Sequence, residues 1–74
     1  MKINTKMVYD LRIYNKDKII TAIAAYNKFC NVKIIAEDKN KVICEFSSDK
    51  IHVNLIINEF DNYLIELMQN NVTD

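Results

Sequence analysis

The only histidine of the chain, His52, is the first residue to consider for chemistry, because imidazole serves as a general base and as a metal ligand. The nearer cysteine, Cys44, lies eight residues earlier, across an expected change from strand to helix. A zinc site or a catalytic base needs partners that lie close in space. We therefore interpret His52 as a solvated residue in the first turn of a helix, and we assign no metal ligand and no catalytic residue.

The two cysteines, Cys30 and Cys44, are separated by 14 positions, and both occupy apolar places in the sequence pattern. The N-terminal residues do not resemble a secretory signal, so we expect a cytoplasmic protein whose thiols are reduced. Buried, inert thiols are the expected outcome. A redox or thioether role for either cysteine remains the alternative.

Carboxylates and hydroxyls are present but are not arranged for catalysis. Glu59, Asp61 and Glu66 fall on the polar side of a long helical pattern, where solvated acids are the usual case. Ser47 and Ser48 have no base partner and are better interpreted, with Asp49, as a helix cap. We therefore expect a protein that is not an enzyme and that needs no cofactor.

Charge also limits the kinds of ligand. Ten basic and ten acidic residues cancel, whereas a nucleic-acid-binding protein needs concentrated positive charge. Lys39, Lys41 and Lys50 lie near one expected hairpin, but Asp38 and Asp49 interrupt them, so a phosphate site is weakly supported. Zero net charge also removes the repulsion that keeps identical chains apart. No apolar run is long enough to cross a membrane.

Seventy-four residues make a single domain, residues 1–74, that is small enough to be marginally stable by itself. Half of the residues are apolar, which excludes a disordered chain. Glycine and proline are absent, so turns must be built from Asn, Asp, Ser and Lys. Residues 1–6 and 70–74 are polar, and we expect both ends to fray.

The longest periodic stretch is a helical pattern over residues 51–68. Its apolar residues recur every three or four positions, as on one face of an amphipathic helix. They are Val53, Ile56, Ile57, Phe60, Leu64, Leu67 and Met68. The helix begins near Lys50 or near Val53, and the sequence does not decide between them.

Residues 7–14 alternate as a half-buried strand, with Met7, Tyr9, Leu11 and Ile13 expected to face the core. A helix follows. Asn15 or Asp17 caps its start, its apolar face holds Ile19, Ala22, Ile23, Tyr26 and Cys30, and Asn31 ends it in a left-handed conformation. Residues 32–37 and 41–46 form a hairpin around residues 38–40, with Val32, Ile34, Ala36, Val42, Cys44 and Phe46 inward.

The resulting order is strand, helix, strand, strand, helix. A helix between two strands implies that those strands are parallel, whereas the hairpin is antiparallel. We predict an α+β fold, a two-layer β-α-β-β-α sandwich with a three-stranded sheet and both helices on one face. It corresponds to a ferredoxin-like unit that lacks its last strand.

Such a fold leaves the second face of the sheet uncovered. The expected outward residues that we propose for partner binding are Val8, Asp10, Arg12, Tyr14, Ile35 and Ile43. Apolar residues with a rim of mixed charge suit a protein–protein contact, and a free strand edge can accept an extended peptide. The alternative is an ordinary surface with scattered apolar side chains.

Several stretches resemble HxsD-like proteins: VYDLRIY, IITAIAAYNKFC, VKIIAEDKNKVICEF and NEFDNYLIELM. Tyr26 and Phe29 correspond to an aromatic position late in the first helix of that family. Glu59, Phe60, Asn62 and Leu64 match its Glu-Phe-x-Asn-x-Leu stretch. The resemblance covers about residues 8–68, whereas longer members continue past the last helix. It implies a small non-enzymatic accessory protein that is associated with radical SAM maturases of ribosomal peptides.

The first functional hypothesis is therefore a binding module that docks a precursor peptide or a radical SAM maturase. The alternative is a small homodimeric structural protein, or a phage or mobile-element protein that acts by occluding a host factor. An enzyme is the least supported hypothesis, because a chain of 74 residues with one histidine and no glycine has little material for a pocket.

Overall fold

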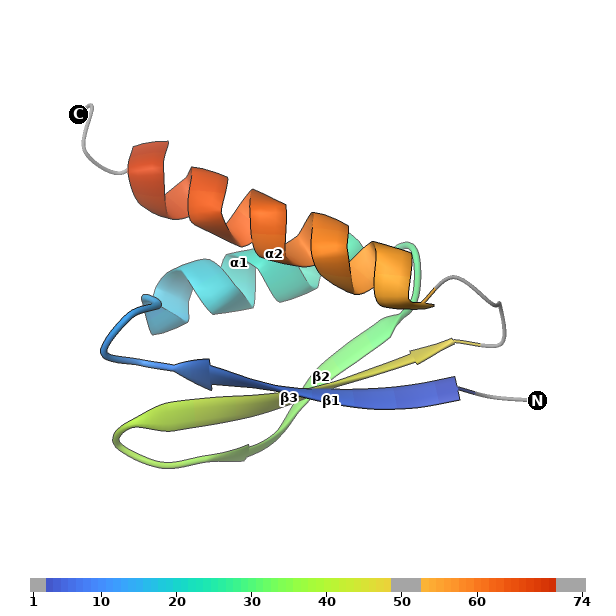
Figure 1. Ribbon diagram of the computed structural model, residues 1–74, viewed down its shortest axis with the longest axis horizontal. Coiled ribbons are helices and arrows are strands. Elements are labelled where there is room, and N and C mark those ends of the chain that lie inside the picture. Colours follow the sequence, from blue (N-terminus) through green and yellow to red (C-terminus); the bar gives the residue numbers. More distant parts are fainter. Residues whose placement is uncertain (1–2, 49–52, 71–74) are drawn as a thin grey trace.

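The computed structural model describes residues 3–48 and 53–70, which form three strands and two helices (Figure 1). In chain order they are β1 (Ile3–Asp10), α1 (Lys16–Tyr26), β2 (Asn31–Glu37), β3 (Lys41–Ser48) and α2 (Val53–Asn70). This is the predicted order of elements.

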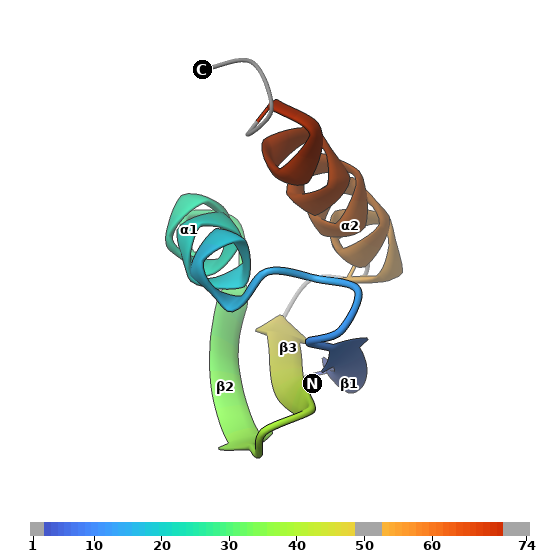
Figure 2. The same ribbon diagram turned by 90° about the vertical axis from the view of Figure 1, so that its left-hand side faces the viewer.

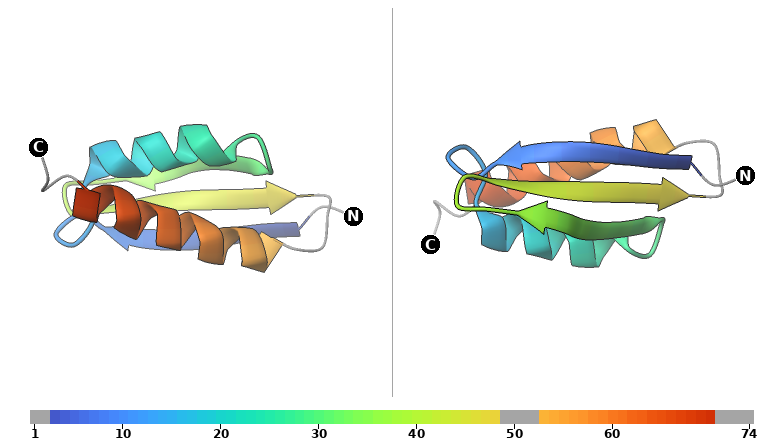
Figure 3. Two further views of the ribbon diagram at one scale, coloured as in Figure 1. Left: turned by 90° about the horizontal axis from the view of Figure 1, so that it is seen from above. Right: turned by 90° about the horizontal axis from the view of Figure 1, so that it is seen from below.

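The three strands form one sheet in the order β1-β3-β2, with both outer strands antiparallel to β3. β1 and β2 are consequently parallel to each other, and α1 makes the crossover between them. Figures 2 and 3 show both helices on the same side of the sheet, α1 over β2 and α2 over β1. The α+β two-layer sandwich predicted from the sequence is confirmed.

β1 begins and ends four residues earlier than predicted. Ile3–Lys6 belong to the strand, so the prediction that residues 1–6 fray is wrong for these four. The strand ends at Asp10, because the carbonyl oxygen of Asp10 accepts hydrogen bonds from the amides of Ile13 and Tyr14 at 3.0 and 2.8 Å. Residues 11–14 form this turn, and their apolar alternation imitates a continued strand.

Three of the four core residues predicted for residues 7–14 contact the core, and one does not. Tyr9 is buried and Met7 packs against the core, as predicted. Leu11 also contacts the core from the turn. Ile13 is 65% exposed, so its predicted place in the core is wrong.

α1 begins as predicted and ends earlier. The side chain of Asn15 accepts hydrogen bonds from the amides of Asp17 and Lys18, as an N-cap residue does. The helix ends at Tyr26, and Asn27 follows with a right-handed backbone (φ −63°, ψ −12°). The side-chain oxygen of Asn27 accepts a hydrogen bond from the main-chain amide of Val32 at 2.9 Å. Asn31 is the first residue of β2, so the predicted left-handed stop there is wrong.

The hairpin of β2 and β3 is confirmed, with one irregularity. Asp38 holds its turn by accepting the amides of Asn40 and Lys41 at 2.8 and 3.0 Å. A β-bulge lies between Ile34 and Ala36. Because the bulge inserts one residue, Ala36 pairs with Ile43 on the uncovered face, and its predicted inward position is wrong.

β3 is the central strand, and it supplies the middle of the core. Val42, Cys44 and Phe46 are fully buried, as their alternation predicted. The strand continues to Ser48, so Ser47 and Ser48 are strand residues and not the predicted helix cap. Asp49, the third member of that cap, lies outside the described residues.

α2 covers the core through the predicted face, in which Val53, Ile57, Phe60 and Leu64 are buried. The described helix runs from Val53, and the predicted choice between a start near Lys50 and one near Val53 falls on residues 49–52, which lie outside the described part. Of residues 70–74, which were predicted to fray, Asn70 is the last described residue of the helix, and residues 71–74 lie outside that part. Among the described residues, neither helix is long and apolar enough to span a membrane.

Candidate docking surface

We call the sheet face opposite the helices the open face (Figure 3). The strand register arranges its side chains in rows that run across the strands, because residues opposite each other in antiparallel strands share a face. The rows are Asn4–Ser47–Asn31, Lys6–Glu45–Lys33, Val8–Ile43–Ala36 and Asp10–Lys41. A single apolar row thus lies between two charged rows.

The apolar row borders a small hollow. Val8 is 59% exposed, Ala36 is exposed and Ile43 is half-buried. A hollow of about 80 Å³ lies at the hairpin end of this row, lined by Ala36, Glu37, Asp38, Lys41 and Ile43. Sites for cofactors and drug-sized ligands typically measure about 300–1,000 Å³. This hollow is therefore large enough for one apolar side chain of a partner and too small for a cofactor.

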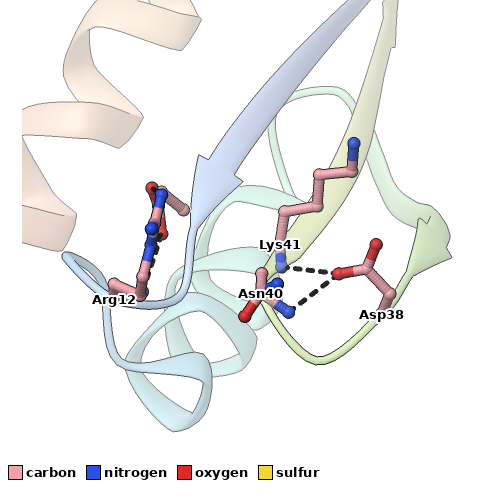
Figure 4. Close-up of polar contacts among 5 residues, drawn as sticks. Arg12, Asp38, Asn40 and Lys41 are labelled. Atoms are coloured by element: carbon pink, nitrogen blue, oxygen red, sulfur yellow. Dashed lines mark hydrogen bonds and ion pairs between the residues drawn. The ribbon is translucent and has the colours of Figure 1, made fainter.

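Both acidic side chains of the hollow are already engaged. Glu37 forms an ion pair with Lys16 of α1, and the Asp38 carboxylate accepts the two turn amides. The ammonium group of Lys41 has no ion-pair partner in the described part of the chain, and Figure 4 shows its side chain extending away from the turn. The hollow therefore presents an apolar floor beside a lysine whose ammonium group forms no direct ion pair with a described residue.

In the charged rows, too, some side chains form ion pairs within the chain and others do not. Lys33 lies 3.8 Å from Glu45, which neutralises the middle of its row. Asp10 is bound by Arg12, which leaves Lys6 and Lys41 as the lysines of the open face without an ion pair to any described residue. Lys6 and Lys41 are therefore two positions of the open face at which an acidic group of a partner can form an ion pair.

Arg12 lies at the end of the open face near the hairpin turn (Figure 4), and Asp10, the last residue of β1, pairs with Lys41 there. The Arg12 guanidinium donates to both carboxylate oxygens of Asp10, with Nε–Oδ1 and Nη2–Oδ2 distances of 3.1 and 2.8 Å. The main-chain amide of Arg12 donates to Oδ1 as well, at 2.8 Å. These hydrogen bonds, the side-chain ones first, lower the pKa of Asp10 to about 2.

Arg12→Ala should raise the pKa of Asp10 from about 2 toward its ordinary value of 3.8. A lowered pKa means that the carboxylate stabilises the fold above pH 3.8 and that this contribution is lost as the pH falls toward 2. The variant should lose part of that acid dependence. Following the Asp10 carboxyl carbon by NMR between about pH 1.5 and 6 measures the shift, and Lys39→Ala serves as a control. A pKa that stays at about 2 in Arg12→Ala would show that the main-chain amide alone sets it.

The structure brings together part of the predicted partner-binding set. Val8, Asp10 and Ile43 lie on the open face, and Arg12 lies at its end in the turn that follows β1. Tyr14 was predicted on the outward side of the first strand, and this is wrong. It is half-buried in the turn, and its ring meets the ring of Tyr9 edge-on at 5.4 Å. Ile35 is 41% exposed at the bulge, outside the paired rows.

Among the residues of this surface that sequence reasoning missed, three bear on the hollow and its charges, namely Ala36, Lys6 and Lys41. Ala36 reaches the open face only through the bulge, for which the sequence offers no glycine as a signal. Lys6 was assigned to a frayed end, although the alternation of residues 3–9 could have placed it on the strand. The importance of Lys41 depends on the engagement of its acidic neighbours, which only the structure shows.

The thiols and the possible metal ligands are the other candidate groups. Cys30 and Cys44 are buried and unpaired, and burial raises both thiol pKa values, that of Cys44 to about 11. They are therefore poor nucleophiles in the fold. Within residues 3–48 and 53–70, no cluster of His, Cys, Asp or Glu could hold a metal ion. The predicted solvated position of His52 lies outside the described residues.

A second hollow, of about 250 Å³, lies beside the helices and is lined by Tyr26, Glu59, Asn62, Tyr63 and Glu66. Its lining includes Glu59 and Glu66, two of the three acids that the sequence placed on the solvated side of α2. Tyr26 donates a hydrogen bond to the carbonyl oxygen of Glu59 at 3.2 Å, and its ring lies 5.7 Å from that of Tyr63. These contacts therefore hold the helix pair together.

The comparisons with known proteins place the chain in no family. No family model matches it, and no curated protein and no solved structure is significantly similar to it. The open face and the resemblance in the sequence are therefore the two observations that bear on function.

Proposed function

We propose that this chain is a non-catalytic accessory protein that docks a precursor peptide during ribosomal peptide modification, as its resemblance to HxsD-like proteins implies. The observation that supports this most is the open face, where an apolar row ends in a hollow that fits one side chain. Docking the radical SAM maturase is the other outcome that the resemblance allows. The buried, unpaired thiols are compatible with action in the cytoplasm.

The charges of the open face favour a particular kind of peptide. Lys41 borders the hollow, and Lys6 lies on the far side of the apolar row. Neither lysine forms an ion pair with a described residue. An extended segment with an aliphatic side chain for the hollow and acidic residues on either side would complement both features. We therefore propose an apolar–acidic segment of the precursor as the docked ligand.

The test is a titration of the protein with labelled peptides of about ten residues that tile the precursor encoded beside its gene, monitored by fluorescence anisotropy. We expect one segment with an aliphatic residue flanked by acids to bind. Ile43→Asp should weaken this binding at least about tenfold, because it puts a charge on the floor of the hollow. Lys41→Glu should weaken it similarly and should reduce its dependence on salt.

Lys28→Glu is the matched control, since Lys28 is an exposed lysine in the turn after α1, away from the open face. Its affinity should equal that of the unmodified protein. If no peptide binds but the purified maturase does, the docked partner is the enzyme and the precursor proposal is wrong. If neither binds, or if Ile43→Asp and Lys41→Glu bind normally, the open face is not the docking surface.

A further inference from the structure

We infer that β1 is also an interaction surface, and that its partner is a second copy of this chain, paired antiparallel to β1 about a two-fold axis at Val8. β1 lies at one margin of the sheet and pairs only with β3 among the described strands (Figure 3). It runs for eight residues without a bulge. A long, regular and unpaired edge is a ready template for another strand. The inference does not depend on the proposed function.

The main chain of β1 has hydrogen-bonding groups available for such a partner. The amide of Leu11 donates to the carbonyl oxygen of Asn40, at the turn end of β3, at 2.7 Å. Along an antiparallel strand, residues whose main-chain groups point to one neighbouring strand alternate with residues whose main-chain groups point to the other side. Since Leu11 points to β3, the amides of Lys6, Val8 and Asp10 point to the free edge. The carbonyl groups of Lys6 and Val8 point there too, whereas that of Asp10 is used in the turn. These groups are sufficient for a short symmetric ladder.

The side chains select one register. A two-fold axis perpendicular to the sheet keeps the open faces of both copies on one side, so the axis must pass through a residue pair. With the axis at Val8, Lys6 of each copy lies opposite Asp10 of the other, and the two Val8 residues lie opposite each other. Moving the axis by one residue in either direction places Val8 opposite Lys6 or opposite Asp10. Only the register at Val8 therefore places opposite charges across from each other and an apolar residue across from an apolar residue.

The other margin of the sheet is less suited to self-pairing. β2 carries the bulge between Ile34 and Ala36, which interrupts a regular ladder and is a common protection of edge strands. Its Lys33 and Glu37 form ion pairs within the chain, to Glu45 and Lys16, as Asp10 of β1 does with Arg12. Lys6 of β1, by contrast, has no ion-pair partner among the described residues. The second copy is therefore expected at β1.

Self-pairing would also enlarge the open face. The apolar row of each copy ends at Val8, so the two rows would join into one that runs from Ala36 of one copy to Ala36 of the other. The zero net charge of the chain leaves little repulsion between the copies. Such a dimer would have two hollows, one at each end of a continuous apolar row.

Charge exchange tests this arrangement by sedimentation velocity on the full chain between about 5 and 500 μM. The unmodified protein should show a monomer–dimer equilibrium. Lys6→Glu and Asp10→Lys should each weaken the dimer about tenfold or more, because each variant opposes like charges at both ends of the ladder. Mixing the two variants should restore association, since one copy then carries acids at positions 6 and 10 and faces a copy that carries lysines at both.

Lys33→Glu is the matched control, because Lys33 occupies the same row as Lys6 on the opposite margin of the sheet. It should leave the dimer unchanged. Val8→Pro removes one outward amide and should abolish dimers, while far-ultraviolet circular dichroism should show that the monomer remains folded, as proline is tolerated on an edge. A protein that is monomeric at about 500 μM, or a dimer that Lys33→Glu weakens as much as Lys6→Glu, would overturn the inference.

Discussion

Phe60→Ala is expected to lower the free energy of unfolding by about 3–5 kcal/mol, the usual cost of removing a buried phenylalanine. A domain of this length is stable by only about 4–11 kcal/mol, so this variant should be partly or largely unfolded. Phe60 is fully buried on α2, and its ring contacts aromatic rings from β3, α1 and β1. The centroid distances are 5.0 Å to Phe46, 5.7 Å to Tyr26 and 5.9 Å to Tyr9. Urea denaturation monitored by circular dichroism measures the loss.

The matched control for this prediction is Leu55→Ala, which shortens a large apolar residue on the same helix. Leu55 is 55% exposed, so its replacement should change the free energy of unfolding by less than about 0.5 kcal/mol. If both variants unfold at the same urea concentration, the face of α2 that packs on the sheet has been assigned wrongly.

The elements that were predicted correctly are those with an unbroken period. Seven apolar residues of α2 recur at helical spacing, and β3 alternates cleanly, so each pattern admits one orientation toward the core. β1 was misplaced by four residues because Leu11 and Ile13 continue the alternation into a turn. That turn is formed by hydrogen bonds to the carbonyl of Asp10 and by the Asp10 carboxylate, which accepts the amide of Arg12, so Asp10 was the one turn signal within the alternating run.

The candidate surface was predictable only in outline. A fold with both helices on one face implies an open face, and Val8, Asp10 and Ile43 were placed on it correctly. Which residues share a row depends on the register between strands, and the bulge at Ile35 shifts that register by one residue. The hollow beside Lys41 exists because Ala36 is turned outward there, and the sequence contains no sign of this.

Tyr9→Phe is expected to lower the free energy of unfolding by about 1.5–3 kcal/mol, the range for a hydrogen bond to a charged group. The Tyr9 hydroxyl donates to Oδ1 of Asp61 at 2.7 Å and so connects β1 to α2 across the core. Removing it leaves the ring in place against Tyr14 and Phe60, so packing is conserved. Thermal unfolding at about pH 7 measures the difference.

Alkaline pH provides a second measure of the same contact. Burial first, and then the hydrogen bond to Asp61, raise the pKa of Tyr9 well above its ordinary value of 10.0. A raised pKa means that the contribution of Tyr9 to stability is complete below about pH 10 and declines as the pH rises further. Above about pH 10 the unmodified protein should therefore lose stability more steeply than Tyr9→Phe.

A double-mutant cycle separates the hydrogen bond from other effects of the substitution. If the hydroxyl acts through Asp61, Tyr9→Phe and Asp61→Ala should be non-additive, with a coupling energy of about 1–2 kcal/mol. Asn62→Ala, an exposed neighbour of Asp61 on α2, should show additive effects with Tyr9→Phe. Additivity in both cycles would mean that the hydroxyl stabilises the fold without Asp61, and that β1 and α2 are joined by their aromatic packing alone.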